Sequence, residues 1–426
     1  AELLTARILG GRAGDGALAE AISVYDRLVL QPDAEPESFR LLATFRLRAN
    51  DTAGAIDAAR LFVTRQEGDA EAVRLLANVL MHADREEEAV DEVVRFLRDT
   101  EGLDEGGAGF RDAVDLLENL VRSRNAWQLF IARADDLIAA RPRVGALRAL
   151  YGEALLRVGL PVQAGVQMEK AMALAGADPM LRYQLATVYG TLGRSAEAVE
   201  LAQGLAEEFP GHHGVQTLLG EMLAGQGRTL QAIEPLGRAV NILADDPTEA
   251  VRRDGLRQKM VELWLDAGEP ERARDTLATL ENPASIDALD LAGRVALVLE
   301  DYEDALGFAQ RLRQGAENGL GVPLEGEIRA AQGDFDQARK LFRDAARIRG
   351  NQIWPIAADA LFRGGAPAAG EEILKDWRDQ EPENPWARYR LGQYLERREN
   401  YRQMEKELAE AIRLYPDFHQ ALNHLG

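Results

Sequence analysis

The feature that most constrains this chain is a repeated spacing of 34 residues between small amino acids. Gly159, Gly193 and Gly227 stand 34 residues apart. An alanine follows each of these glycines five residues later, and a glycine or alanine precedes each of them by seven residues. A fixed period of this length with small-residue anchors is typical of stacked helix-turn-helix units. Because one such unit cannot bury its apolar face alone, the chain is expected to fold as an array.

Within each period, the apolar residues follow the spacing of two amphipathic helices. Segments 145–178, 179–212 and 213–246 align without gaps, and each carries two i, i+3, i+4, i+7 patterns on either side of a glycine turn. We expect the small residue of the first helix to lie where the paired helix crosses it, because close approach requires small side chains. We expect the turn glycine to end the first helix in the left-handed conformation.

The period continues in both directions and predicts about twelve units, with a thirteenth that is cut at Gly426. Because Gly426 falls inside a first helix, we expect the chain to be a fragment of a longer protein or to end where order is lost. The glycine-rich segment 10–16 lacks the lysine of a phosphate-binding loop, so we interpret it as a turn in the first unit. The expected units start near residues 2, 36, 70, 111, 145, 179, 213, 254, 286, 319, 351, 385 and 419.

Two joints depart from the period, because the spacing between small positions grows to 41 residues at each of them. Residues 99–110 hold four glycines and four acids and predict an extended loop, whereas residues 244–253 contain a proline that lengthens a helix or loop. In the unit after the first joint, Glu118 and Phe130 stand where small residues belong. The joints are either kinks between blocks or ordinary repeat drift with insertions. The corresponding block division is 1–110, 111–253 and 254–426.

Composition excludes several classes of function. The net charge of −21 disfavours nucleic acid and anionic membrane surfaces as ligands and favours a basic partner. The chain has no cysteine, so it has no disulfide, zinc–thiolate site or cysteine nucleophile. No apolar run is long enough to predict a membrane-spanning segment. These observations leave the bacterial cytoplasm and the periplasm open, and removal of an N-terminal signal would leave a lipid anchor open as well.

Motifs for catalysis or metal binding are absent from the sequence. None of HExxH, GxSxG or GxxxxGK[ST] occurs. The adjacent His212 and His213 lie in an expected turn and lack an acidic partner at ligand spacing. Acidic pairs such as Asp245 and Asp246 are typical of a solvated helix face. We therefore expect no enzyme activity, no metal and no cofactor.

The repeated pattern resembles the tetratricopeptide repeat family over essentially the whole chain. The family asks for small residues at the helix crossings, a large residue nearby and a proline near the end of the unit. The resemblance implies an all-α, right-handed superhelical α-solenoid of about twelve repeats, of the kind found in long bacterial scaffold proteins. Two units that match are Ala186, Tyr189, Ala198 with Pro210, and Gly326, Ala338, Phe342 with Ala345.

By this resemblance the protein is a non-catalytic scaffold or adaptor that binds a peptide or partner protein in a concave groove. The alternative is a regulatory or assembly region of a larger enzyme or secretion complex, such as periplasmic exopolysaccharide or outer-membrane machinery. Fold alone does not decide between them.

The family's groove is lined by the first helix of each unit, roughly at its positions 2, 5, 9 and 12. In two successive units a basic residue precedes a polar one there, which resembles a clamp for a peptide carboxylate. The other interpretation is that these arginines are solvated or pair with nearby glutamates. The clamp candidates are Arg40, Thr44, Arg74 and Asn78.

Elsewhere the same face carries aromatic residues, which are common anchors in binding grooves. In repeat arrays such residues also serve internal packing, and we expect Trp354 to be of that kind. The aromatic groove candidates are Tyr183, Phe362, Trp386 and Tyr389.

Overall fold

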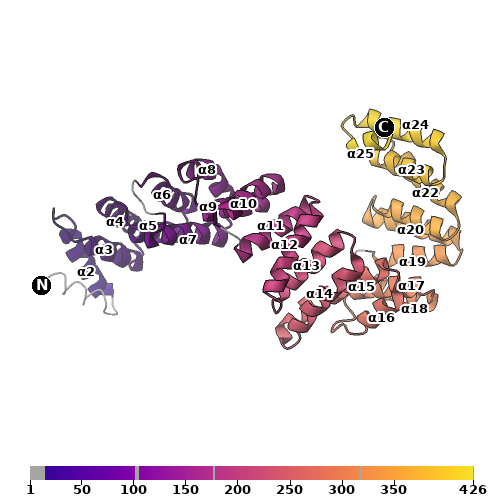
Figure 1. The fold of residues 1–426 in the computed structure, drawn as a ribbon, viewed down its shortest axis with the longest axis horizontal. Coiled ribbons are helices and arrows are strands. Elements are labelled where there is room, and N and C mark those ends of the chain that lie inside the picture. The colour runs from indigo at the N-terminus through magenta and orange to yellow at the C-terminus, as the bar shows by residue number, and fades with distance from the viewer. Residues whose placement is uncertain (1–14, 101–104, 176–177, 316–318, 426) are drawn as a thin grey trace. The chain divides into compact units, whose positions relative to one another are not determined.

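The structure, a computed structural model, shows antiparallel helix pairs and no strand in the part of the chain that it describes (Figure 1). The predicted all-α solenoid is therefore confirmed. No helix in that part is long and apolar enough to cross a membrane. The predicted turn at 10–16 lies outside the described residues except for its last two, and so does Gly426. The described residues are 15–100, 105–175, 178–315 and 319–425.

Helix contacts divide the chain into two compact units, Ala1–Phe209 and Pro210–Gly426. The three-block division stays a prediction. The helices of the first unit are α2 (Asp15–Leu28), α3 (Pro36–Arg48), α4 (Thr52–Arg65), α5 (Ala70–His82), α6 (Glu86–Asp99), α7 (Ala108–Ser123), α8 (Trp127–Ala140), α9 (Gly145–Arg157), α10 (Pro161–Ala175), α11 (Pro179–Thr191) and α12 (Ser195–Glu208).

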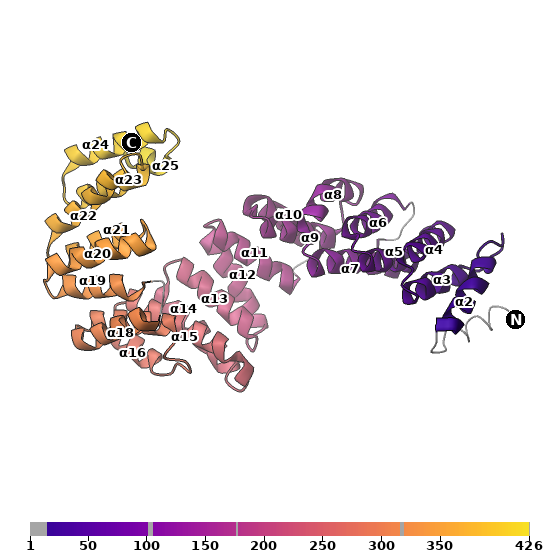
Figure 2. The same cartoon turned by 180° about the vertical axis from the view of Figure 1, so that it is seen from behind.

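The second unit continues the alternation of first and second helices (Figure 2). A short 3-10 helix, η1 (Pro247–Glu249), precedes its longest helix. The helices of this unit are α13 (His213–Gly225), α14 (Thr229–Ile242), α15 (Ala250–Asp266), α16 (Pro270–Leu277), α17 (Ile286–Val298), α18 (Tyr302–Gly315), α19 (Gly321–Ala331), α20 (Phe335–Arg349), α21 (Ile353–Arg363), α22 (Pro367–Gln380), α23 (Pro385–Arg397), α24 (Tyr401–Leu414) and α25 (His419–Leu425).

First helices begin where the period predicts them. Eight begin at the predicted residue, and α7, α15, α19 and α21 begin within a few residues of it. The shifts at α7 and α15 fall at the two irregular joints, where inserted residues extend the following helix toward its N-terminus. The eight coincident starts are Pro36, Ala70, Gly145, Pro179, His213, Ile286, Pro385 and His419.

One turn position has a left-handed backbone in eleven successive units, including the three predicted glycines. Its φ angle lies between 53° and 92° in all of them. Glycine occupies this position without steric cost, but five units place another residue there. The residues are Asn50, Asp84, Asn125, Gly159, Gly193, Gly227, Gly268, Glu300, Gly333, Gly365 and Glu399.

The small residues of the first helices lie at the predicted crossings. A Cβ added to Gly220 would lie 2.6 Å from Leu236 of the paired helix, and one added to Gly152 would lie 2.6 Å from Met168. In the same slot Ala186 is fully buried. Contacts below 3 Å leave no room for a larger side chain unless the paired helix moves.

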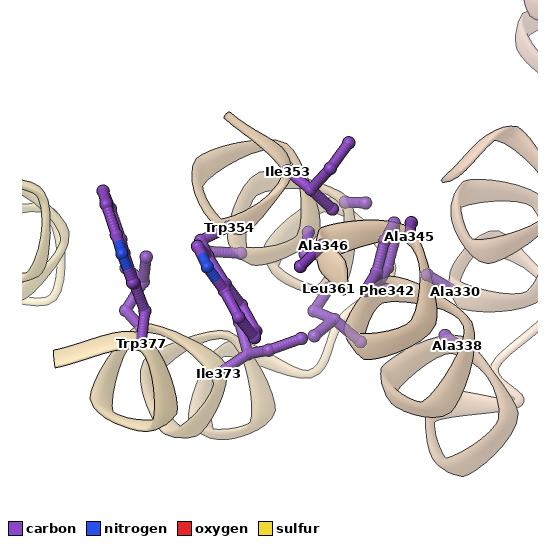
Figure 3. Close-up of a cluster of buried hydrophobic side chains, with 14 of the residues drawn as sticks. Ala330, Ala338, Phe342, Ala345, Ala346, Ile353, Trp354, Leu361, Ile373 and Trp377 are labelled. Atoms are coloured by element: carbon purple, nitrogen blue, oxygen red, sulfur yellow. The ribbon is translucent and has the colours of Figure 1, made fainter. Parts of the chain in front are cut away.

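A large apolar cluster in the C-terminal repeats joins α19, α20, α21, α22 and α23, and Figure 3 shows part of it. Phe342 is fully buried in it, and Trp354 is 4% exposed, which confirms that Trp354 serves packing. The Trp354 ring extends from α21 toward Ile373 of α22 in Figure 3. Each repeat thus buries its apolar stripe against both neighbours, as the period requires.

At the first joint, Arg141 contacts residues on both sides of the inserted segment. Arg141 at the end of α8 donates to the carbonyl oxygens of Leu97 and Thr100, at 2.8 and 2.9 Å. Its guanidinium lies 3.6 Å from Glu105 and packs over the Phe110 ring. These bonds satisfy carbonyl groups at the end of α6 that have no partner within the helix.

At the second joint, Arg253 has the corresponding role. It is 6% exposed and donates to the carbonyl oxygens of Leu243 and Asp246 and to the Glu281 carboxylate. Beside it, the Asp254 carboxylate accepts the backbone N–H groups of Glu281 and Asn282. Asn282 lies beyond the end of α16, which stops after eight residues where most second helices have fourteen.

Candidate functional site

Polar side chains occupy the ninth position of successive repeats in the second unit, counted from the expected repeat starts at 286, 319, 351 and 385. Arg294 of α17, Glu327 of α19, Asp359 of α21 and Gln393 of α23 share this register. Residues three or four apart lie on one face of a helix, so positions 5, 9, 12 and 13 form one stripe beside the buried core. We refer to this stripe as the first-helix face.

Ion pairs link this face from one repeat to the next. Arg363 of α21 donates to Glu327 of α19 at 3.3 Å, and Arg397 of α23 pairs with Asp359 of α21. In both pairs, an arginine at the thirteenth position reaches a carboxylate at the ninth position of the preceding repeat. These pairs give the stacked face a regular electrostatic pattern, and exposed ion pairs of this kind contribute little to stability.

A hollow of about 290 Å³ lies between α21 and α23 on this face. Its wall is mostly polar and contains both signs of charge. The Arg390 guanidinium donates to Gln393 at 3.0 Å within it. The lining residues are Pro355, Ala358, Asp359, Leu374, Arg390, Gln393, Tyr394, Glu396 and Arg397.

Two titratable groups on this face have shifted pKa values. Burial raises the pKa of Glu327, whose side chain is 15% exposed, and the charges of Arg294 and Arg363 oppose the shift. Burial likewise raises the pKa of Tyr394 to about 12. The Tyr394 hydroxyl is a neutral donor, and it donates to the carbonyl oxygen of Pro367 at 3.1 Å.

Phe362, one of the predicted groove aromatics, lies at the edge of this hollow. Its ring is half-buried and meets the Tyr394 ring edge to face at 6.0 Å. The Arg397 guanidinium lies over Phe362 at 4.7 Å from the ring centre. The structure therefore brings Phe362 together with three residues that the sequence did not single out, namely Asp359, Tyr394 and Arg397.

Trp386 and Tyr389 lie together on α23, in an aromatic cluster that includes Phe418. Tyr389 is only 8% exposed and accepts a hydrogen bond from Gln393 at 3.0 Å. Trp386 is 44% exposed, and its ring centre lies 4.7 Å from that of Phe418. Of the two predicted anchors, Trp386 is exposed and Tyr389 mainly packs beneath it, so the anchor role stays a prediction.

In the first unit, Arg40 and Thr44 lie on α3, and Arg40 lines an open hollow of about 600 Å³. Arg40 donates to both Glu37 oxygens, at 2.7 and 2.6 Å, and this pairing raises the pKa of its guanidinium. Thr44 donates to the Arg40 carbonyl oxygen at 2.8 Å. A peptide carboxylate would have to displace Glu37. The hollow is lined by Glu35, Pro36, Glu37, Arg40, Phe62, Gln66, Asp69 and Glu71.

The other predicted groove residues lie on the same kind of face. Arg74 and Asn78 are both exposed on α5, one turn apart. Tyr183 is half-buried on α11. The clamp and the groove role of these residues stay predictions.

A second charged cluster occupies the divergent unit around Glu118. Arg122 donates to Glu118 at 2.7 Å and to Glu153 of the next repeat at 2.9 Å. Burial raises the pKa of Glu118, and Arg122 opposes the shift. A charge pair to the next repeat therefore replaces the small-residue contact that the period calls for at this position.

The histidine pair has a structural role. His212 caps α13 by accepting the Val215 N–H at 3.3 Å, and the His213 ring stacks on it at 5.5 Å. Among the described residues, no group of three His, Asp or Glu side chains is arranged to hold a metal ion.

Sequence reasoning missed the ion pairs of the first-helix face. The available signal was a polar residue at position 9 in each unit and an arginine at position 13 in two successive units, Arg363 and Arg397. That signal needed the repeat register, which the period supplied. Predicting the ion pairs also required the distance between neighbouring first helices, and the repeat period does not give that distance.

Comparison with known proteins agrees with this architecture. A family model described as tetratricopeptide repeat matches residues 183–250 and 324–385. No curated protein sequence matches the chain. Among solved structures, yeast Tom70 is 13% identical, with 100% of this chain and 94% of that chain covered and a TM-score of 0.43.

Two other solved structures match part of the chain. Pseudomonas aeruginosa PilF is 17% identical over 53% of this chain and 97% of its own, with a TM-score of 0.40. YrrB, described as a tetratricopeptide repeat protein with an unusual peptide-binding site, is 21% identical over 45% of this chain and 95% of its own, with a TM-score of 0.35. The two matched segments, and the helix pairs that continue their period, show that this chain contains tetratricopeptide repeats.

Proposed function

We propose that this chain is a non-catalytic scaffold that binds a partner protein or an extended peptide along its first-helix faces. The observation that carries the proposal is the hollow between α21 and α23, which combines charged side chains with a neighbouring aromatic contact whose Phe362 ring is half-buried. The face is held by packed helices, so binding requires little ordering of the protein.

The chemistry of this hollow favours a segment that carries both charges and hydrogen-bonding groups. Arg390 and Gln393 present donors, whereas Glu396 presents a carboxylate. Trp386 on the same helix provides an exposed aromatic surface of the kind found at binding hot spots. An extended peptide fits this description, because its backbone amides alternate donors and acceptors.

The hollow beside α3 favours basic residues in the partner. Four carboxylates line it, and its arginine, Arg40, already pairs with Glu37. The net charge of −21 adds long-range attraction for a basic segment. This attraction is expected to weaken with salt, because exposed charges are screened within about 8–10 Å at physiological ionic strength.

The direct test is site-specific photo-crosslinking. A photoreactive amino acid replaces Gln393 on the first-helix face, and the matched control replaces Arg347, which is 78% exposed on the second helix α20. Incubation with lysate of the source organism is followed by mass spectrometry of the crosslinked bands. We expect one partner band at position 393 that Arg390→Glu weakens. Equal crosslinking at both positions, or a band indifferent to Arg390→Glu, would overturn the proposal.

The regulatory or assembly role in a larger enzyme or secretion complex remains the alternative prediction. It differs in its expected result, because the partner would then be a fixed subunit that copurifies with the chain in constant ratio.

A further inference from the structure

The early end of α16 leaves an apolar hollow on the second-helix side of the repeats. Helix α16 has eight residues, whereas α14 and α18 on either side have fourteen each. The residues after α16 form a non-helical connection to α17, so the last turns of a second helix are missing here. The floor of the space is α17, which presents Ala288, Ala292 and Ala296 to it.

This hollow has a volume of about 420 Å³ and a mainly apolar wall. That size lies within the range of well-formed ligand sites. Leu277 and Phe308 on its two sides are only partly buried, so apolar surface faces solvent. The lining residues are Arg274, Leu277, Ala278, Leu280, Pro283, Ala284, Ala288, Ala292, Val295, Ala296, Leu299, Asp301, Asp304, Phe308 and Arg311.

Two arginines at the edge of the hollow, Arg274 and Arg311, have no ion-pair partner among the described residues. Comparison with the equivalent positions of other repeats explains why. Between the second helices α20 and α22, Arg339 pairs with Glu372 at 2.5 Å, and Arg343 donates to Asp376 at 3.0 Å. These pairs join equivalent parts of neighbouring repeats. They show which positions of adjacent second helices face each other.

At the hollow, the same positions lack the carboxylates. Arg274 corresponds to Arg339, but Gly307 stands where Glu372 would be. Arg311 stands where Asp376 would be, and Ala278 stands opposite it, at the position equivalent to Arg343. In the part of the chain that the structure describes, neither Arg274 nor Arg311 has an ion-pair partner, and the Arg311 guanidinium lies over the Phe308 ring at 5.8 Å.

We propose that this hollow binds a short, acidic, amphipathic helical segment of a partner protein. Its apolar side chains fill the space above Ala288, Ala292 and Ala296, where the missing turns of α16 would pack. Its carboxylates pair with Arg274 and Arg311. The site is separate from the first-helix face and does not depend on the function proposed for that face.

The acids at the opposite end set the orientation of the segment. Asp304 lies seven residues before Arg311 on α18, which places the two about 10 Å apart along the helix axis. The segment therefore has a carboxylate at the Arg311 end, and the residue that lies next to Asp304 is basic or neutral. A uniformly acidic segment would meet repulsion from Asp301 and Asp304.

The probe for this site comes from the chain itself. A fluorescent, end-capped peptide with the α22 sequence PAAGEEILKDWRDQ carries apolar residues beside the carboxylates that pair with Arg339 and Arg343 in this fold. The control peptide replaces the residues equivalent to Glu372 and Asp376 with lysine. Binding of both to the full chain is measured by fluorescence anisotropy.

We expect the acidic peptide to bind at least about tenfold more tightly than the lysine peptide, since a charge-assisted pair is worth roughly that factor or more. Arg274→Glu combined with Arg311→Glu reverses the preference. Ala278→Glu supplies an internal carboxylate for Arg311 and weakens the acidic peptide, while Ala292→Trp fills the hollow and removes binding of both. Circular dichroism verifies that each variant keeps its helix content.

Two controls keep this test independent of other surfaces. Arg347→Glu changes an exposed charge on α20, and Arg397→Glu changes the first-helix face; neither is expected to alter the affinity. Equal binding of the two peptides, no binding to the unaltered chain at about 1 mM, or an affinity indifferent to Ala278→Glu would each overturn the proposal.

Discussion

At the scale of single residues, the turn after each first helix imposes the same backbone demand in every described repeat. Six of its eleven occupants are glycine, and Asn or Asp occupies three more. Asn and Asp tolerate the left-handed conformation better than other non-glycine residues. Glu300 and Glu399 lack this advantage, at φ angles of 60° and 57°.

Replacing Glu399 with glycine is therefore expected to stabilise the second unit by about 1 kcal/mol or slightly less. The left-handed cost of about 1–2 kcal/mol is removed, and the extra unfolded-state freedom of glycine offsets part of the gain. Urea denaturation measures the difference. The matched control, Glu383→Gly, changes an exposed turn residue whose φ is not positive and is expected to lower stability. A loss of stability in both variants would contradict the prediction.

The buried acid Glu327 makes stability depend on pH. Burial raises its pKa in the folded state above that of the unfolded chain, so its ionisation opposes folding. This penalty is present above the folded pKa and disappears as the pH falls toward the unfolded value. Lowering the pH through this range thus increases the contribution of this group to stability.

We expect Glu327→Gln to be more stable than the unaltered chain at pH 7.5, with a gap that closes toward pH 4. The lost pair with Arg363 costs little, because the Arg363 side chain is 66% exposed. Denaturant titrations across this pH range measure the gap. Glu303→Gln on the exposed side of α18 is the control for removal of one surface charge. A gap that widens on acidification would contradict the assignment.

At the scale of elements, the joint between α14 and α15 depends on one buried arginine. Arg253 satisfies two backbone carbonyls and pairs with Glu281, so its bonds connect the end of α14 to the connection after α16. Loss of a buried donor leaves its acceptors without partners, which costs about 1–3 kcal/mol for each group.

Arg253→Met is expected to destabilise the second unit by about 3 kcal/mol and to increase hydrogen exchange around residues 243–254. Its neighbour Arg252 provides the control, because its side chain is 54% exposed and pairs with Glu249 on the surface. Arg252→Met should change stability by less than about 1 kcal/mol. Equal effects of the two substitutions would show that the joint does not depend on the buried contacts.

At the scale of the whole molecule, stability is distributed along the array. Each repeat contacts mainly its neighbours, so the free energy is approximately a sum of repeat and interface terms. The cluster around Phe342 contributes to three successive repeats at once, which makes it a sensitive point in the second unit.

Phe342→Ala is expected to cost about 3–5 kcal/mol, because the side chain is fully buried. The loss of stability should be confined to the repeats that contact Phe342. Hydrogen exchange is expected to accelerate between residues 319 and 397 and to stay unchanged in α3 to α6 of the first unit. Uniform acceleration over both units would show that the array unfolds as one cooperative body instead.

The sequence by itself determined the repeat, the helix starts and the turn glycines of this protein. These features depend on residues that are close together in the chain, such as Gly193 at the turn and Ala186 at the helix crossing. The spacing of such residues follows directly from the geometry of one helix pair. The all-α class followed because every period carries the same two amphipathic patterns.

Only the tertiary structure decided which polar side chains meet. Arg40 was a candidate clamp by spacing, but its nearest carboxylate is Glu37 on its own helix. Glu327 and Arg363 stand 36 residues apart and meet only because two first helices pack side by side. The hollow beside α16 likewise arises from turns that are missing relative to its neighbours. Period and composition describe single units, whereas distances between units follow from how their side chains pack.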